Sequence, residues 1–169
     1  MKERTGLHAF KGSPLTLVGD GDVKAGDHAP DFTAYKSLTD AVKLSDYRGK
    51  TVVISAIPSI DTPVCERQTA RFNDEASKLG DNVVVLTVSM DLPPAQARWC
   101  AAKDAKNVVM LSDYRGHDFG NKFGLVVKEL GLLARAVYVV GPDGVVKFAH
   151  IVPELSAEPD YAPVLAAIK

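Results

Sequence analysis

Residues 51–80, TVVISAIPSIDTPVCERQTARFNDEASKLG, are the stretch of sequence that decides the fold. The β-branched run at residues 51–55 shows no polar alternation, which predicts a strand covered on both faces. Residues 63–79 predict a helix closed by Gly80, because their apolar positions recur every three or four residues and share one face. Those positions are Cys65, Thr69, Phe72, Ala76 and Leu79. A second β-branched run at residues 83–88 completes a predicted β-α-β unit.

The segments on both sides of this unit complete the predicted domain. Before it we expect a hairpin over about residues 8–18 with its turn at Gly12-Ser13, and short strands near residues 32–35 and 42–44. After it we expect a helix over 93–105, a strand near 108–111, a short helix near 119–123, two strands over 136–140 and 145–149 joined by Gly141-Pro142-Asp143-Gly144, and a helix over 161–168. This order predicts one α/β domain over residues 1–169, with a thioredoxin-like fold that carries an insertion between its halves.

Composition excludes several classes of function. The chain has 169 residues, 46% of them hydrophobic and 24% charged, which is typical of a globular domain with its own core. The net charge of −1 provides no positive field for nucleic acid or anionic lipid. No apolar run approaches the roughly 18–20 residues of a membrane helix, and the first residues lead into no secretory signal. We therefore expect a cytoplasmic protein that binds neither nucleic acid nor membrane.

Cys65 occupies a position where a thiol can become reactive. Thr62 suits the N-cap and Pro63 suits the first helical position, which places Cys65 at the third. A thiolate there would be stabilised by the positive end of the helix dipole and by free N–H groups. The alternative is that Cys65 is a small buried hydrophobic residue, which is the usual fate of a free cysteine.

The remaining candidate residues are ambiguous when taken alone. Cys100 lies well inside the second predicted helix, where a core role beside Trp99 is the simplest interpretation. Two cysteines at this spacing form neither a C-x-x-C pair nor a zinc site, and the four histidines are scattered, so no metal is expected. Arg135 directly precedes a buried strand. It either caps the edge of the sheet or points at an anion on Cys65 across the strand ends, where α/β sheets usually bind ligands.

These residues resemble the peroxiredoxin family. Pro58, Thr62 and Cys65 fit its P-x-x-x-T-x-x-C motif, and Ala29-Pro30-Asp31-Phe32 resembles its opening segment. Within the family the chain is similar to the bacterial thiol peroxidases, which are atypical 2-Cys peroxiredoxins. That similarity is carried by the N-terminal hairpin, Pro58-Ser59-Ile60-Asp61-Thr62, Asp91-Leu92-Pro93, Ala95-Gln96, Cys100, Ala134-Arg135-Ala136 and Glu158-Pro159-Asp160-Tyr161. Pro94 and Trp99, near the second cysteine, are local variations.

The resemblance implies a function and a role for each residue. Cys65 would be the peroxidatic cysteine, which attacks a hydroperoxide and becomes a sulfenic acid. Cys100 would be the resolving cysteine, which forms an intramolecular disulfide with it. Thr62 and Arg135 would hold and polarise the peroxide, and Pro58 would shield the sulfenic acid. The substrates would be hydrogen peroxide and alkyl hydroperoxides, and the insertion in the fold would be of the peroxiredoxin type.

The resemblance also implies partners. Thioredoxin would reduce the disulfide, and the chain would form a homodimer. No organic cofactor or metal would be needed, because the sulfur itself carries the redox chemistry. Two other classes of function stay open on the residues alone. One is a peroxide sensor or redox-switched chaperone that uses the same disulfide, and the other is a thioredoxin-like binding module with two inert thiols.

Overall fold

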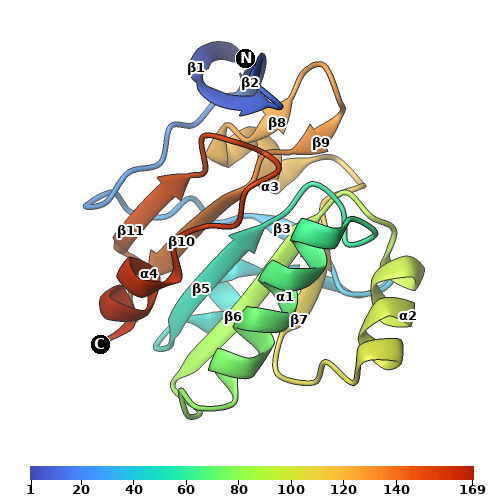
Figure 1. The fold of residues 1–169 in the computed structure, drawn as a ribbon. Coiled ribbons are helices and arrows are strands. Elements are labelled where there is room, and N and C mark those ends of the chain that lie inside the picture. The colour runs from blue at the N-terminus through green and yellow to red at the C-terminus, as the bar shows by residue number, and fades with distance from the viewer.

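A mixed sheet of seven strands runs through the centre of the computed structural model, which describes residues 1–169 (Figure 1). The central strands β5 (Thr51–Ala56), β6 (Val83–Ser89) and β7 (Val109–Ser112) are parallel to one another. Antiparallel strands flank them, so the spatial order is β11 (Val146–Ile151), β10 (Ala136–Val140), β5, β6, β7, β3 (Thr33–Tyr35) and β4 (Ala41–Lys43). All six residues of β5 are buried, as the unbroken β-branched run predicts.

Helices cover both faces of this sheet. One face packs against α1 (Pro63–Ala76), α2 (Pro93–Lys103) and α4 (Tyr161–Ile168), and a cluster of 13 buried residues fills the space between them. The other face packs against α3 (Asp118–Phe123) and a second, smaller sheet through a cluster of 22 buried residues. Because α1 and α2 lie on the same face, Cys65 and Cys100 are on the same side of the main sheet (Figure 1). No helix combines the length and the apolar character needed to cross a membrane.

The smaller sheet contains the N-terminal hairpin. Its strands are β1 (Lys2–Phe10), β2 (Ser13–Gly19), β8 (Val126–Val127) and β9 (Leu132–Leu133), in that spatial order. The predicted hairpin exists, but it is longer than expected and its turn lies one residue earlier, at Lys11-Gly12. Both turn residues have positive φ, 49° and 81°, which is the backbone of a two-residue turn that matches the strand twist. The prediction at Gly12-Ser13 was wrong by one residue, because Lys11 adopts a positive φ and takes the first turn position.

Most of the predicted elements are confirmed, and the differences lie at their ends. Helix α1 ends at Ala76 rather than near residue 79, and α2 ends at Lys103. The chain passes from β4 into a short 3-10 helix, η1 (Leu44–Tyr47), which was not predicted. Strands β8 and β9 were also missed, because two residues are too few to produce a periodic pattern.

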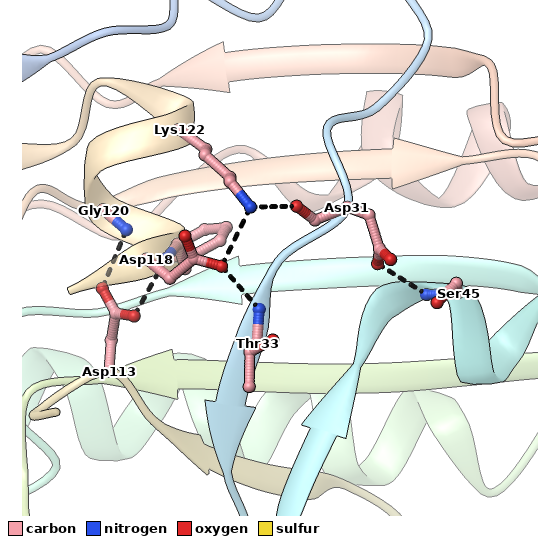
Figure 2. Close-up of polar contacts among 8 residues, drawn as sticks. Asp31, Thr33, Ser45, Asp113, Asp118, Gly120 and Lys122 are labelled. Carbon is pink, nitrogen blue, oxygen red and sulfur yellow. Dashed lines mark hydrogen bonds and ion pairs between the residues drawn. The ribbon is translucent and has the colours of Figure 1, made fainter. Parts of the chain in front are cut away.

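Two carboxylates attach α3 to the main sheet (Figure 2). Asp113, which follows β7, accepts hydrogen bonds from the backbone N–H groups of Phe119 and Gly120, at 3.0 and 2.8 Å. Asp118 accepts one from the N–H of Thr33 in β3, at 2.8 Å. Burial outweighs the two N–H donors and raises the pKa of Asp113 to about 6. The Asp113 carboxyl group, which anchors α3, therefore changes its protonation state near pH 6.

Candidate active site

Cys65 lies at the start of α1, directly after the loop that leaves β5. Thr62 is the N-cap residue, with φ −114° and ψ 146°, and Pro63 is the first residue of the helix. Cys65 is therefore the third helical residue, as predicted, and its side chain is fully buried. The N–H groups of Val64 and Cys65 have no backbone acceptor, because they belong to the first turn. Free donors and the positive end of the helix dipole therefore meet at this cysteine.

The side chain of Thr62 does not cap the helix as its position suggested. Its hydroxyl donates instead to the backbone carbonyl of Ser59, at 2.8 Å, inside the loop before α1. The proton of the hydroxyl is thereby committed, and the lone pairs of the oxygen stay available as acceptors. Thr62 is exposed, whereas Pro58 in the same loop is buried. The loop thus presents the hydroxyl oxygen of Thr62 to solvent beside the helix that carries Cys65.

Arg135 reaches Cys65 from the other end of the sequence. It lies between β9 and β10, is 1% exposed, and donates from Nη2 to Cys65 Sγ at 3.3 Å. Its Nε donates to the carbonyl of Leu155 at 2.8 Å, and its Nη1 donates to Gln68 Oε1 at 2.8 Å. The structure therefore supports the second interpretation of Arg135, in which its side chain points at Cys65.

The charge of Arg135 has no carboxylate partner. None of the salt bridges in the structure involves this residue. A buried cation is costly unless an opposite charge lies next to it. The ionised sulfur of Cys65 is the group in contact that would neutralise the guanidinium.

Gln68 orients Arg135, and sequence reasoning missed it. It lies three residues after Cys65 on α1, so the two side chains share a face, and it is fully buried. Its Oε1 accepts from Arg135 while its Nε2 donates to Ser55 Oγ of β5 at 2.8 Å. A polar residue on the buried stripe of an amphipathic helix was the signal that could have revealed this role.

The role of Asp91 was also missed by sequence reasoning. It follows β6, and its carboxylate accepts from Ser59 Oγ at 2.8 Å and from the N–H of Ile60 at 2.8 Å. It also accepts from Ser89 Oγ at 2.6 Å. These bonds hold the loop before Cys65 against the end of β6. A carboxylate directly after a buried parallel strand was the available signal, because ligand sites gather at such strand ends.

Cys100 lies in α2 and is not among the hydrogen-bond partners of Arg135, which are Cys65, Gln68 and Leu155. Both cysteines are free thiols, and Cys100 is half-buried whereas Cys65 is fully buried. Burial raises the pKa of the Cys100 thiol. Of the predicted site residues, the structure therefore brings Arg135 into contact with Cys65, keeps Thr62 and Pro58 in the loop before it, and places Cys100 on a separate helix.

Comparison with known proteins identifies the family of this chain. The family model described as Redoxin matches residues 24–165. The chain belongs to the redoxin family. Its curated relatives there include the thiol peroxidase of Bacillus subtilis strain 168, 52% identical over 160 residues and covering 95% of each chain. Another is the thiol peroxidase of Staphylococcus aureus strain MRSA252, 49% identical over 95% of this chain and 96% of the relative. The predicted place among the thiol peroxidases is thus confirmed.

A solved structure agrees as well. The crystal structure of a peroxiredoxin-like protein from Aquifex aeolicus superposes with a TM-score of 0.88 at 37% identity. The match covers 98% of this chain and 95% of that one. The predicted thioredoxin-like α/β fold is therefore confirmed over nearly the whole length.

Proposed function

We propose that this protein is a thiol peroxidase that reduces hydrogen peroxide and alkyl hydroperoxides, with Cys65 as the nucleophile. The observation that carries the proposal is the buried Arg135, which donates to Cys65 Sγ at 3.3 Å and has no carboxylate partner. A guanidinium that never loses its charge favours the thiolate, which is the form of cysteine that attacks. The names of the relatives, thiol peroxidases, support the same chemistry.

The first step would oxidise Cys65. Its thiolate attacks one oxygen of the hydroperoxide, so an S–O bond forms and the O–O bond breaks. Cys65 becomes a sulfenic acid, and the second oxygen leaves as hydroxide or alkoxide and takes a proton from water. Arg135 and the free N–H groups of the first turn stabilise the developing negative charge, and Thr62 Oγ1 accepts from the hydroperoxide O–H.

The second step would join the two cysteines. The thiol of Cys100 condenses with the sulfenic acid of Cys65, which forms a disulfide and releases water. The two thiols of reduced thioredoxin then exchange with this disulfide, which restores both cysteines and leaves thioredoxin oxidised. Pro58 lies buried in the loop before Cys65 and would shield the sulfenic acid until Cys100 arrives.

The setting of the reaction follows from the family resemblance. We place the enzyme in the cytoplasm as a homodimer, with residues 1–169 as one domain and with thioredoxin as its reductant. No cofactor enters the proposed cycle, because the electrons pass from thioredoxin to the peroxide through the two cysteines alone.

Peroxide consumption coupled to thioredoxin, thioredoxin reductase and NADPH tests the proposal. The wild-type protein should consume hydrogen peroxide and at least one alkyl hydroperoxide, and C65S should consume neither. C100S should undergo one oxidation, leave a sulfenic acid that a dimedone probe traps on Cys65, and then stop. Equal loss of the first oxidation in both variants would overturn the assignment of the two cysteines. Oxidation of Cys65 without sustained turnover in the wild-type protein would instead favour the sensor.

A further inference from the structure

A polar contact joins the neighbours of the two cysteines. Glu66 follows Cys65 in α1, and Trp99 precedes Cys100 in α2. The indole Nε1 of Trp99 donates to Glu66 Oε1 at 2.8 Å, and Lys103 Nζ lies 3.3 Å from the same oxygen. The two contacts, with Trp99 first, lower the pKa of Glu66, so its carboxylate is charged at neutral pH. We call these three residues, Glu66, Trp99 and Lys103, the helix clamp.

The helix clamp ties the turn that carries Cys65 to the turn that carries Cys100 while both sulfurs are free thiols. Consecutive residues of an α-helix point about 100° apart, because one turn takes 3.6 residues. When Glu66 faces α2, Cys65 must point elsewhere, and its sulfur contacts Arg135. Cys100 follows Trp99 in α2, packs half-buried against the cluster that contains Cys65, and keeps a free thiol. The arrangement that closes the helix clamp is therefore one in which the disulfide does not form.

Packing reinforces this arrangement. Trp99 is only 8% exposed and belongs to the same buried cluster as Cys65 and Phe72. A disulfide requires Cα atoms within about 7 Å and suitably directed Cβ atoms. Rotation or unwinding of the first turn of α1, or of the Trp99 turn of α2, toward such a geometry breaks the bond between Glu66 and Trp99.

We infer that the helix clamp holds the peroxide-reactive arrangement and must open before Cys100 reaches Cys65, so that Glu66 is a positioning residue that sets the rate of the resolving step. This inference rests on the proposed function. A closed clamp lengthens the lifetime of the sulfenic acid at Cys65. A second hydroperoxide can then transfer an oxygen to it, giving a sulfinic acid and water or an alcohol. The strength of the clamp thus decides between recycling and inactivation.

Trp99 makes the inference measurable, because it is the single tryptophan of the chain. Rapid mixing of reduced protein with excess peroxide should give two fluorescence phases. The rate of the first phase depends on the peroxide concentration, and this phase reports oxidation of Cys65. The rate of the second phase is independent of the peroxide concentration, and this phase reports clamp opening with disulfide formation. E66A removes the acceptor for both donors, whereas E66Q keeps an acceptor for Trp99 and loses the charge opposite Lys103.

The matched control is E75A. Glu75 lies on the same helix and pairs with Arg71 at 3.1 Å and with Lys78 at 3.8 Å, so it has no contact with α2. In E66A we expect the second phase to accelerate about 10- to 150-fold, the range for one part-buried hydrogen bond to a charged group, to which the exposed ion pair adds little. E66Q should lie between E66A and the wild type, and E75A should match the wild type. The first phase should stay within about twofold in all of them.

Mass spectrometry supplies an independent readout. At a fixed excess of peroxide, E66A should accumulate less sulfinic acid at Cys65 than the wild type, and E75A should accumulate the same amount. W99F keeps an aromatic ring and loses the N–H donor, and alkylation of quenched samples should show faster disulfide formation in it too. These variants separate the hydrogen bond from the packing of the ring.

Several outcomes would overturn the inference. If E66A and W99F form the disulfide no faster than the wild type, the helix clamp does not control resolution, and the proposed peroxidase function stands. Slower resolution would mean that the contact brings Cys100 toward Cys65 rather than holding it away. If the wild-type protein consumes peroxide but forms no disulfide between Cys65 and Cys100, both the inference and the second step of the proposed function are wrong.

Discussion

Substitution of Arg135 by lysine separates the charge of this residue from its shape. Three nitrogens of the guanidinium donate in three directions, to Cys65 Sγ, Gln68 Oε1 and the carbonyl of Leu155. A lysine keeps the positive charge but has a single nitrogen on a flexible stem. It cannot serve the three acceptors with the geometry that the guanidinium uses. R135K should therefore slow the first oxidation although the charge is preserved.

The magnitude follows from the contacts that are lost. A hydrogen bond to a charged group contributes about 1.5–3 kcal/mol. If the bond to the sulfur and to the developing oxyanion is lost in the transition state, the first oxidation slows by about 10- to 150-fold. Leaving the buried Gln68 Oε1 without a donor costs about a further 1–3 kcal/mol of unfolding free energy, and the part-buried Leu155 carbonyl costs less. R135K should thus be both slower and less stable.

Stopped-flow fluorescence at several peroxide concentrations gives the second-order rate constant of the first oxidation. Chemical denaturation of the reduced protein gives the change in stability. R71K is the control, because Arg71 is an exposed arginine that pairs with Glu75 and lies over the ring of Tyr161. An R135K protein that is folded and oxidises within twofold of the wild type would refute the reasoning. The positive charge would then be sufficient for the first oxidation, and the three-donor geometry of the guanidinium would have no role in catalysis.

Three further results are expected. T62V should slow the first oxidation about two- to tenfold, because one neutral hydrogen bond is lost, while T62S should keep the wild-type rate; equal rates for T62V and T62S would contradict the role of the hydroxyl. The pKa of Asp113 is raised to about 6, so its contribution to stability is present below about pH 4 and lost as the pH rises through 6. The unfolding free energy of the wild type minus that of D113N should therefore fall by about 2 kcal/mol from pH 4 to pH 7, and a difference independent of pH would show that Asp113 is not protonated in the fold. Amide hydrogen exchange should differ between reduced and oxidised protein in the first turn of α1 and in residues 91–103, and identical exchange there would exclude the unwinding step.

The elements around Cys65 were predictable because their determinants are local. A β-branched run forms a buried strand, a threonine and a proline start a helix, and an apolar stripe selects its buried face. These rules act over a few residues, so the order β5, α1, β6 and the place of Cys65 at the third helical position could be predicted from residues 51–88. The end of α1 and the turn at Lys11-Gly12 shifted slightly, because several conformations of similar energy compete at such points.

The partners of Cys65 depend on contacts between distant parts of the chain. Arg135 follows it by 70 residues, and the pairing of β10 with β5 brings the two side chains together. Residue spacing alone left Arg135 with two possible roles and predicted no role for Gln68, Asp91 or Glu66. The sequence by itself determined which cysteine begins a helix and which helix face is buried, because periodicity and capping are local properties. Only the tertiary structure decided which charge meets the sulfur and which side chains join α1 to α2, because those contacts arise when separate elements pack.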